Sequence, residues 1–245
     1  IDYDFQNKFE KKISNKSNKY IERSFNAAFN LINRDISNKL INGPISKKNF
    51  LNNKFLGITE FFAKKFNTKK IAMLIYNKAL SVSPVTTHLP IKSVSKAISK
   101  KSISEKVFLI DDFYKTYIGY KPKIAVTGLN PHCESISRFN EDEKIVKHAV
   151  KGLTKRKFKV SGPYAADTIF LRKNRKKFDV ILGMYHDQVL SPIKTLFEYD
   201  AINITLGLPF VRISPDHGPN EKMLGKNVSS PLSLYKAISF LERLK

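Results

Sequence analysis

Short, continuous apolar runs recur along the chain and are bounded by turn residues. Runs of this kind are typical of strands buried inside a parallel sheet. We predict strands within 38–44, 71–76, 80–86, 180–184 and 203–209, and two more that begin near 123 and 160. The runs at 71–76 and 80–86 lie so close together that they favour a hairpin.

Amphipathic stretches, with apolar residues three or four positions apart, separate many of these runs. This spacing is typical of helices that bury one face. We predict helices at 21–36, 92–99, 103–118, 140–154 and 190–197, and a closing helix that begins at Ser230 and Pro231. Residues 212–218 are predicted to form a turn-rich segment. The alternation of strands and helices predicts an α/β fold with a mainly parallel sheet.

Three of the five histidines stand where a predicted strand ends. His88, His132 and His186 follow the runs at 80–86, 123–131 and 180–184. Ligands of open α/β sheets bind beyond the carboxyl ends of the strands, and neutral imidazole is a common metal ligand. Each histidine alone could equally be a hydrogen-bonded residue at a strand end. Three at equivalent positions favour a shared metal site, because a catalytic zinc-type site needs three protein ligands.

The charge balance is strongly basic, with 44 Lys and Arg against 21 Asp and Glu and a formal net charge of +23. Such a charge is compatible with a nucleic-acid surface. The lysines are scattered, however, and no known nucleic-acid-binding motif is present, so we interpret most of them as solvated surface. The single cysteine, Cys133, excludes an internal disulfide and is typical of the reducing cytosol. No apolar stretch is long enough to cross a membrane, and we expect a cytoplasmic protein.

Eight short blocks resemble, in order, the signature segments of one enzyme family. They are Asn42–Lys47, Gly57–Phe62, Thr86–Pro90, Gly128–His132, Gly162–Thr168, Met184–Gln188, Asn203–Pro209 and Asp216–Gly218. The family is 4-hydroxythreonine-4-phosphate dehydrogenase, which acts in the biosynthesis of vitamin B6 and pyridoxal phosphate. The resemblance runs from about residue 38 to the end of the chain.

The resemblance implies a two-domain α/β/α fold like that of isocitrate and isopropylmalate dehydrogenases. We expect residues 1–55 and 205–245 to form the first domain and 56–204 the second. The family carries a further Gly-rich segment at its N-terminus, and this chain begins at Ile1 without a methionine. The first domain is therefore expected to be incomplete here. The family also implies a homodimer with its active site at the subunit interface.

The implied reaction is the oxidation of 4-phosphooxy-L-threonine by NAD or NADP to 2-amino-3-oxo-4-phosphooxybutanoate, which loses carbon dioxide to give 3-amino-2-oxopropyl phosphate. The implied metal ligands are His88, His132 and His186, holding zinc or, alternatively, magnesium or cobalt. The implied substrate-binding residues are Thr59, Lys194, Asn203 and Arg212. Lys194 and Asp167 are the implied catalytic residues, with Asp167 a proton acceptor. By spacing alone, Asp167 could equally be a helix cap.

One departure from the family pattern leaves the identity of the substrate undecided. Ile58 stands where the family usually has a substrate-binding histidine, and isoleucine cannot donate a hydrogen bond. A sister dehydrogenase of another phosphorylated hydroxy acid, such as threonate or erythronate 4-phosphate, is therefore the first alternative. The second is a non-catalytic basic module that binds nucleic acid, with an affinity that falls steeply as salt rises.

Overall fold

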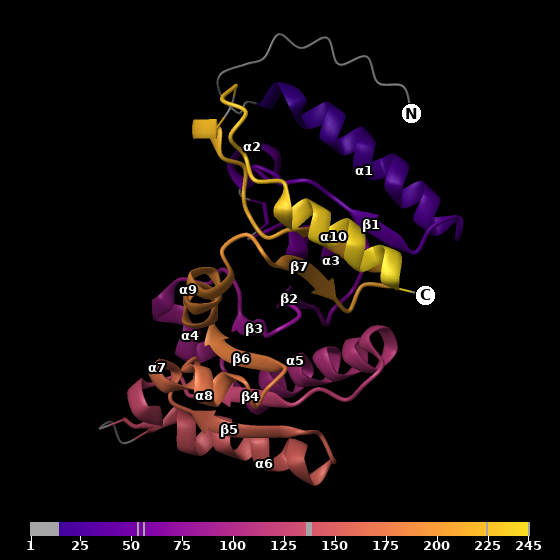
Figure 1. Cartoon of the computed structure of the whole chain (residues 1–245). Coiled ribbons are helices and arrows are strands. Elements are labelled where there is room, and N and C mark those ends of the chain that lie inside the picture. Colours follow the sequence, from indigo (N-terminus) through magenta and orange to yellow (C-terminus); the bar gives the residue numbers. More distant parts are fainter. Residues whose placement is uncertain (1–14, 53, 56, 136–138, 224, 245) are drawn as a thin grey trace.

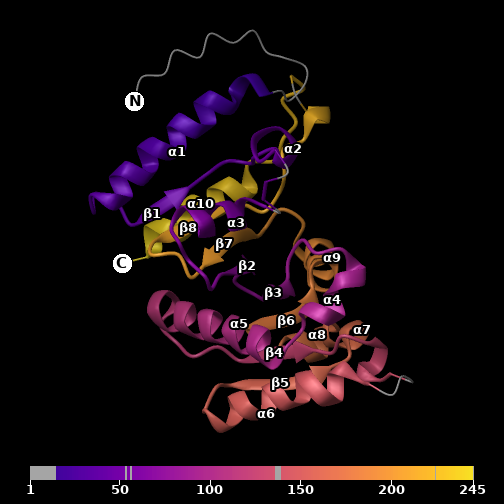
Figure 2. The ribbon, with the colours of Figure 1, turned by 180° about the vertical axis from the view of Figure 1, so that it is seen from behind.

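The computed structural model describes residues 15–52, 54–55, 57–135, 139–223 and 225–244. Its strands form one sheet in the order β1-β8-β7-β2-β3-β6-β4-β5 (Figures 1 and 2). The strands are β1 (Lys39–Ile41), β2 (Ala72–Tyr76), β3 (Ser81–Thr86), β4 (Ile124–Thr127), β5 (Val160–Tyr164), β6 (Val180–Tyr185), β7 (Ile202–Leu206) and β8 (Val211–Pro215). The predicted α/β class is confirmed.

Helices pack against both faces of this sheet. The α-helices are α1 (Asn18–Asn33), α2 (Lys47–Phe50), α3 (Ile58–Lys65), α4 (Ile91–Ala97), α5 (Lys100–Phe113), α6 (Lys147–Lys155), α7 (Ala166–Ile169), α8 (Arg172–Arg175), α9 (His186–Phe197) and α10 (Leu232–Arg243). Tyr114–Ile118 and Asp142–Val146 are π-helical turns, and Asn15–Ser17, Pro131–Cys133 and Glu221–Met223 are 3-10 turns. None of the helices in the described part of the chain is both long and apolar enough to cross a bilayer.

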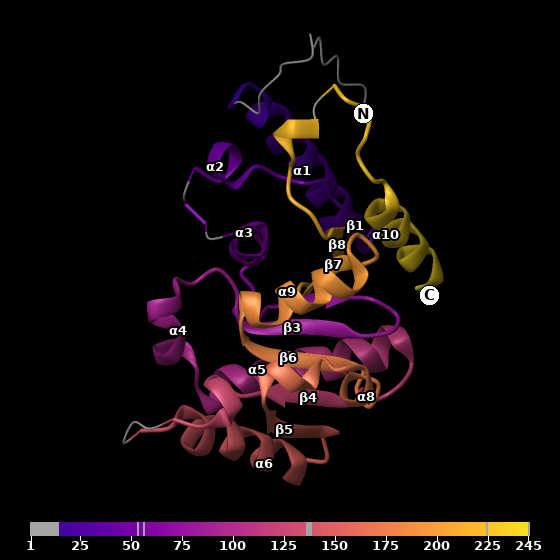
Figure 3. The ribbon, with the colours of Figure 1, turned by 60° about the vertical axis from the view of Figure 1, so that its left-hand side comes forward.

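The sheet is parallel in one half and antiparallel in its centre. Strands β3, β6, β4 and β5 run parallel to one another and lie side by side in Figure 3. Strand β2 runs antiparallel to both β3 and β7, so the predicted hairpin is confirmed. Because β7 is also antiparallel to β8, parallel pairing is found among β3, β6, β4 and β5 and between β1 and β8, and the prediction of a mainly parallel sheet fails in the centre.

The structure corrects two of the predicted elements, besides shifts of a few residues at other boundaries. The segment 212–218 was assigned to turns, yet β8 covers Val211–Pro215 and is buried along its whole length. Arg212 and Pro215 interrupt the apolar pattern that would have predicted a strand. Pro215 is tolerated because it is the last residue of the strand. Helix α9 begins at His186 rather than at 190, since its first turn is polar and Asp187 there suits the helix dipole.

The two ends of the described chain meet at the same end of the sheet. In Figures 1 and 2, α1, α10 and β1 lie together at the end opposite β5 and α6. A cluster of phenylalanines fills the space between α1 and α3, and its buried members are Phe25, Phe29, Phe62 and Phe210. The predicted domain boundary at 204/205 falls inside β7. The division into 1–55 with 205–245 and 56–204 stays a prediction.

Candidate functional site

A cavity of about 440 Å³ opens at the carboxyl ends of β3 and β6. Six of the predicted site residues line it, namely Thr59, His88, His186, Lys194, Asn203 and Arg212. The wall between them is partly apolar and includes Ile58, Met73, Ile75 and Leu190. Polar groups converging on a partly apolar cavity are the usual form of a small-molecule site.

The fold brings His88 and His186 together. Strands β3 and β6 are parallel neighbours, and each histidine lies just beyond the end of its strand. The centroids of the two imidazole rings are 5.6 Å apart. His186 Nδ1 lies 2.6 Å from Oδ1 of the exposed Asp187. Both rings therefore face the same small volume.

His132 and Asp167 lie elsewhere in this chain. His132 follows β4, the other neighbour of β6, on the exposed 3-10 turn, and it is absent from the cavity lining. Helix α7, which carries the exposed Asp167, packs against that turn. Within the described residues, no three His, Cys, Asp or Glu side chains are close enough to hold a metal ion. The three-histidine site stays a prediction.

The turn that carries His132 has an uncommon backbone. His132 and Cys133 have φ angles of 54° and 61°, in the left-handed region that non-glycine residues rarely occupy. Each such residue costs about 1 kcal/mol or more, and residues of this kind cluster at functional sites. The loop must therefore be held by its surroundings.

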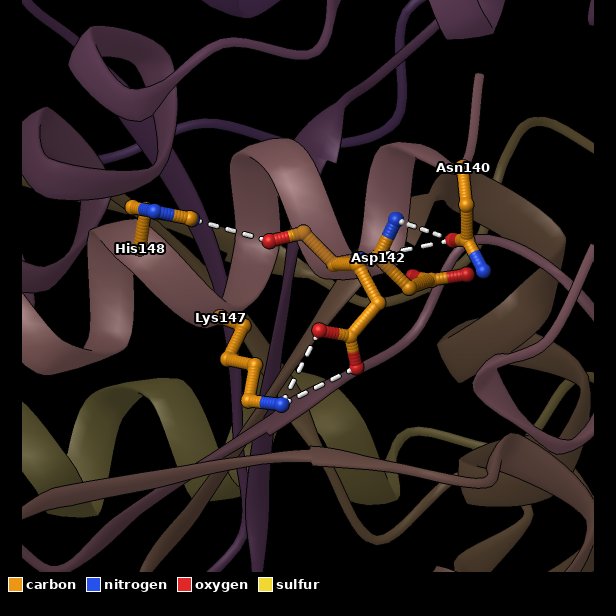
Figure 4. A network of polar contacts seen from close by, with 5 residues as sticks. Asn140, Asp142, Lys147 and His148 are labelled. Atoms are coloured by element: carbon orange, nitrogen blue, oxygen red, sulfur yellow. Dashed lines mark hydrogen bonds and ion pairs between the residues drawn. The ribbon is translucent and has the colours of Figure 1, made fainter. Parts of the chain in front are cut away.

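Asp142 holds this loop. Its fully buried carboxylate accepts hydrogen bonds from the backbone N–H of Leu129 at 2.6 Å and from the backbone N–H and side-chain amide of Asn130, both at 3.0 Å. Asn140 Oδ1 in turn accepts the N–H groups of Asp142 and Glu143 and fixes the start of the helix (Figure 4). The segment between β4 and His132 is thus tied to the helix that follows it.

We expect Asp142→Asn to lower the free energy of unfolding by about 3 kcal/mol. The variant loses hydrogen bonds to a buried charge, and the NH₂ group of the new amide faces other N–H donors. Urea denaturation measures this change. The matched control is Glu143→Gln, whose side chain is about half exposed and pairs with Lys147 at 2.9 Å. That exposed pair contributes less than about 1 kcal/mol. Equal losses in both variants would contradict the role given to Asp142.

Arg212 is the most unusual group in the cavity. It is fully buried in β8; its Nε donates to Asn42 Oδ1 at 2.7 Å and its Nη1 to Thr205 Oγ1 at 3.0 Å. Among the described residues no carboxylate pairs with it, and its Nη2 has no hydrogen-bond partner. Burial lowers the pKa of Arg212 to about 9, so the guanidinium remains charged at neutral pH. A buried cation without a counter-charge calls for an anionic ligand.

The cavity lining also holds a second cation and an acceptor that has no partner among the described residues. Lys194 Nζ lies 2.5 Å from Asp216 Oδ2, and Ser233 Oγ accepts the backbone N–H of Asp216 at 2.8 Å. Burial raises the pKa of Asp216, although Lys194 opposes this effect. The Oδ1 of Asn203 is buried without a partner among the described residues. Asp216 and Ser233 were not predicted as site residues because no sequence spacing relates them to Lys194.

Glu60 is a further residue that the sequence analysis missed. It lies in the first turn of α3, and its Oε1 accepts the hydroxyl of Thr87 at 2.9 Å. Burial alone would raise the pKa of Glu60, but the neighbouring His88 and Thr87 outweigh burial and hold that pKa below its ordinary value. The Gly57–Phe62 block was its only signal in the sequence.

Comparison with known proteins places this architecture in a family. Residues 4–241 match the family model described as pyridoxal phosphate biosynthetic protein PdxA. The chain belongs to this family. The resemblance drawn from the sequence blocks is therefore confirmed.

Members of this family align with most of the chain. A 4-hydroxythreonine-4-phosphate dehydrogenase of Sulfurihydrogenibium sp. is 42% identical over 210 residues, which are 84% of this chain and 65% of that protein. The enzyme of the same name from Ruegeria sp. is 34% identical, over 84% of this chain and 64% of that protein. The chain thus spans a little under two thirds of the length of these relatives.

Solved structures agree with the fold. The 4-hydroxythreonine-4-phosphate dehydrogenase of Klebsiella pneumoniae superposes with a TM-score of 0.80 at 28% identity, covering 96% of this chain and 73% of that one. A terephthalate dihydrodiol dehydrogenase of Burkholderia xenovorans, at 20% identity and a TM-score of 0.68, shares the fold alone. The expected isocitrate and isopropylmalate dehydrogenase-like architecture is confirmed.

Proposed function

We propose that this protein is a metal- and NAD(P)-dependent dehydrogenase that oxidises 4-phosphooxy-L-threonine in pyridoxal phosphate biosynthesis. The relatives named 4-hydroxythreonine-4-phosphate dehydrogenase support the proposal. The observation that carries it is Arg212, a buried cation of the cavity lining whose Nη2 has no hydrogen-bond partner among the described residues. A phosphate pairs with the planar fork of arginine and supplies the missing negative charge.

The histidines fit a divalent metal, zinc being our first choice over magnesium or cobalt. His88 and His186 line one cavity, and the centroids of their imidazole rings are only 5.6 Å apart. Imidazole nitrogen suits zinc and cobalt better than it suits magnesium. A metal held by these residues would lower the pKa of the substrate hydroxyl and orient it.

The remaining roles fall to charged side chains. Lys194, fixed by Asp216, stabilises negative charge on the substrate oxygen as its proton leaves. Thr59 and Asn203 hold the substrate by hydrogen bonds, Asn203 through its unpaired Oδ1. Asp167 is the proposed proton acceptor, and with His132 it lies exposed at the molecular surface. We therefore propose a homodimer in which the interface completes the site.

A second cavity has room for a nicotinamide cofactor, which would accept the hydride when bound. This cavity measures about 980 Å³ and shares Pro44, His217 and Gly218 with the first. The size exceeds what the small substrate needs and suits a larger ligand. We assign the dinucleotide to it for this reason.

The proposal is tested with the protein expressed from its complete gene. We expect NAD reduction with 4-phosphooxy-L-threonine and zinc, and we expect His186→Ala to lower kcat/KM by more than about 100-fold because a metal ligand is lost. The absorbance of NADH follows the reaction. The control is His148→Ala, an exposed histidine of α6 whose Nδ1 contacts the backbone oxygen of Glu143 (Figure 4). Full activity of His186→Ala would refute the proposed metal site.

One observation favours a second candidate substrate. Ile58 lies in the cavity wall, where it offers no polar contact to the amino and carboxyl end of a substrate. A sister reaction on threonate or erythronate 4-phosphate is therefore the alternative. A panel of these three phosphates, compared by kcat/KM, decides between them. Membership of an enzyme family favours either reaction over a nucleic-acid-binding module.

A further inference from the structure

Glu60 and His88 meet in a largely buried corner beside the cavity, which His88 lines. Glu60 comes from α3, whereas Thr87 and His88 come directly after β3. Thr87 Oγ1 donates to Glu60 Oε1 at 2.9 Å, and His88 Nδ1 lies 3.7 Å from the same oxygen. The side chains of His88 and Glu60 are only 22% and 24% exposed. The carboxylate is thus already oriented by one donor and faces the imidazole.

Two polar atoms in this corner have no hydrogen-bond partner in the described structure. They are His88 Nδ1 and Glu60 Oε2, both inaccessible to solvent. A buried polar atom without a partner costs about 1–3 kcal/mol. Closing 3.7 Å to the usual N–H···O distance requires a movement of roughly 0.8 Å. Such a movement would satisfy Nδ1 at little cost.

Gly57 makes room for this pair. A Cβ at that position would lie 2.7 Å from His88 Cε1 and 2.8 Å from Glu60 Oε2, closer than real contacts allow. Gly57 has a φ of −167°, extended backbone that any residue adopts. Space, and not conformation, therefore requires glycine here. The backbone of residue 57 is packed directly against both partners.

We propose that Glu60 is a positioning residue that accepts the Nδ1–H of His88 and leaves Nε2 unprotonated for a metal ion. A neutral imidazole carries one proton, so a carboxylate that takes the hydrogen bond at Nδ1 leaves the lone pair at Nε2. Carboxylate partners of this kind fix the tautomer and ring orientation of metal-binding histidines. This inference rests on the proposed function and adds a residue that supports its ligand.

The competing explanation is that Glu60 only ties Thr87 to α3. The hydrogen bond from Thr87 satisfies that role without any effect on the imidazole. The two explanations differ in the tautomer of His88 in the metal-free protein. Nitrogen-15 NMR of the imidazole rings reads this tautomer directly, and a His88→Gln spectrum assigns the signals.

We expect the metal-free full chain to show His88 mainly as the Nδ1–H tautomer. Glu60→Gln should reduce the share of that tautomer at least twofold, whereas the exposed Glu143→Gln should not change it. An Nε2–H tautomer in the unchanged protein, or the same tautomer in Glu60→Gln, would overturn the proposal. This measurement needs no metal, so it tests the role of Glu60 even if the proposed metal site is refuted.

Zinc affinity, measured by isothermal titration, provides the second readout. We expect Glu60→Gln to bind zinc roughly 10- to 100-fold more weakly. Thr87→Val, which removes the donor to Glu60, should weaken binding in the same direction, and Thr87→Ser, which keeps the hydroxyl, should restore it. Thermal unfolding checks that each variant is folded. The proposal would be overturned if zinc affinity were unchanged in both Glu60→Gln and Thr87→Val. If the unchanged protein bound no zinc, that result would refute only the proposed metal site.

Discussion

Arg212→Lys is expected to lower kcat/KM for the phosphorylated substrate by roughly 30- to 1,000-fold, equivalent to about 2–4 kcal/mol. Lysine keeps the positive charge but loses the planar fork that pairs with a phosphate. The change also removes donors from Asn42 Oδ1 and Thr205 Oγ1. Steady-state kinetics with 4-phosphooxy-L-threonine, NAD and zinc measure the effect.

A matched pair of controls makes this prediction specific. Arg172→Lys, at an exposed position on α8, should leave the kinetics unchanged. With a substrate analogue that lacks the phosphate, the unchanged protein and Arg212→Lys should become nearly equal, because the lost interaction is then absent from both. A full loss that persists with the unphosphorylated analogue would assign Arg212 a structural role instead.

Phe62→Ala should lower the free energy of unfolding by about 3–5 kcal/mol, as is typical when a large buried aromatic side chain is removed. Phe62 is fully buried, and its ring meets Phe25 edge to face at a centroid distance of 5.3 Å and Phe29 at 5.7 Å. Urea denaturation gives the change. The control, Ile91→Ala, alters a side chain that is 70% exposed and should stay within about 0.5 kcal/mol.

The same ring also contacts Arg212, the residue proposed to bind the phosphate of the substrate. The guanidinium of Arg212 lies over Phe62, with its Cζ 5.2 Å from the ring centroid. Phe62→Leu keeps most of the buried volume but loses the aromatic face, so we expect a smaller stability loss together with a raised KM. A stability change below 1 kcal/mol in Phe62→Ala would show that the phenylalanine cluster does not stabilise this end of the fold.

Apolar patterning predicted most of the elements and the end of the sheet at which the candidate cavity opens. Strands β3 and β6 were visible as apolar runs, and the histidines beyond them indicated where the cavity would open. The family resemblance added Thr59, Lys194, Asn203 and Arg212, all of which line that cavity. These residues could be named because they lie in blocks of recognisable sequence.

Interactions between distant segments could not be predicted. Strand β8 was missed because Arg212 interrupts its apolar pattern, and the arginine is tolerated only because Asn42 and Thr205 accept its hydrogen bonds. Asp216 forms an ion pair with Lys194, although β7 and β8 separate the two residues in the sequence. No local spacing in the sequence predicts this contact. The exposed position of His132 depends equally on how its loop is held. Periodicity describes single elements, whereas these contacts arise from the order of strands in the sheet.

That strand order constrains how the protein is made. Lys39 of β1 pairs with Val211 of β8, 172 positions later, and Tyr76 of β2 faces Ile202 of β7. A ribosome adds about 5–20 residues per second, so β1 waits roughly 10–30 s for the partner that the described sheet gives it. During this interval its apolar residues are available to chaperones and to wrong partners. Translation that stops before residue 211 would leave β1 without its β8 partner, and we expect such truncated chains to be cleared by proteolysis.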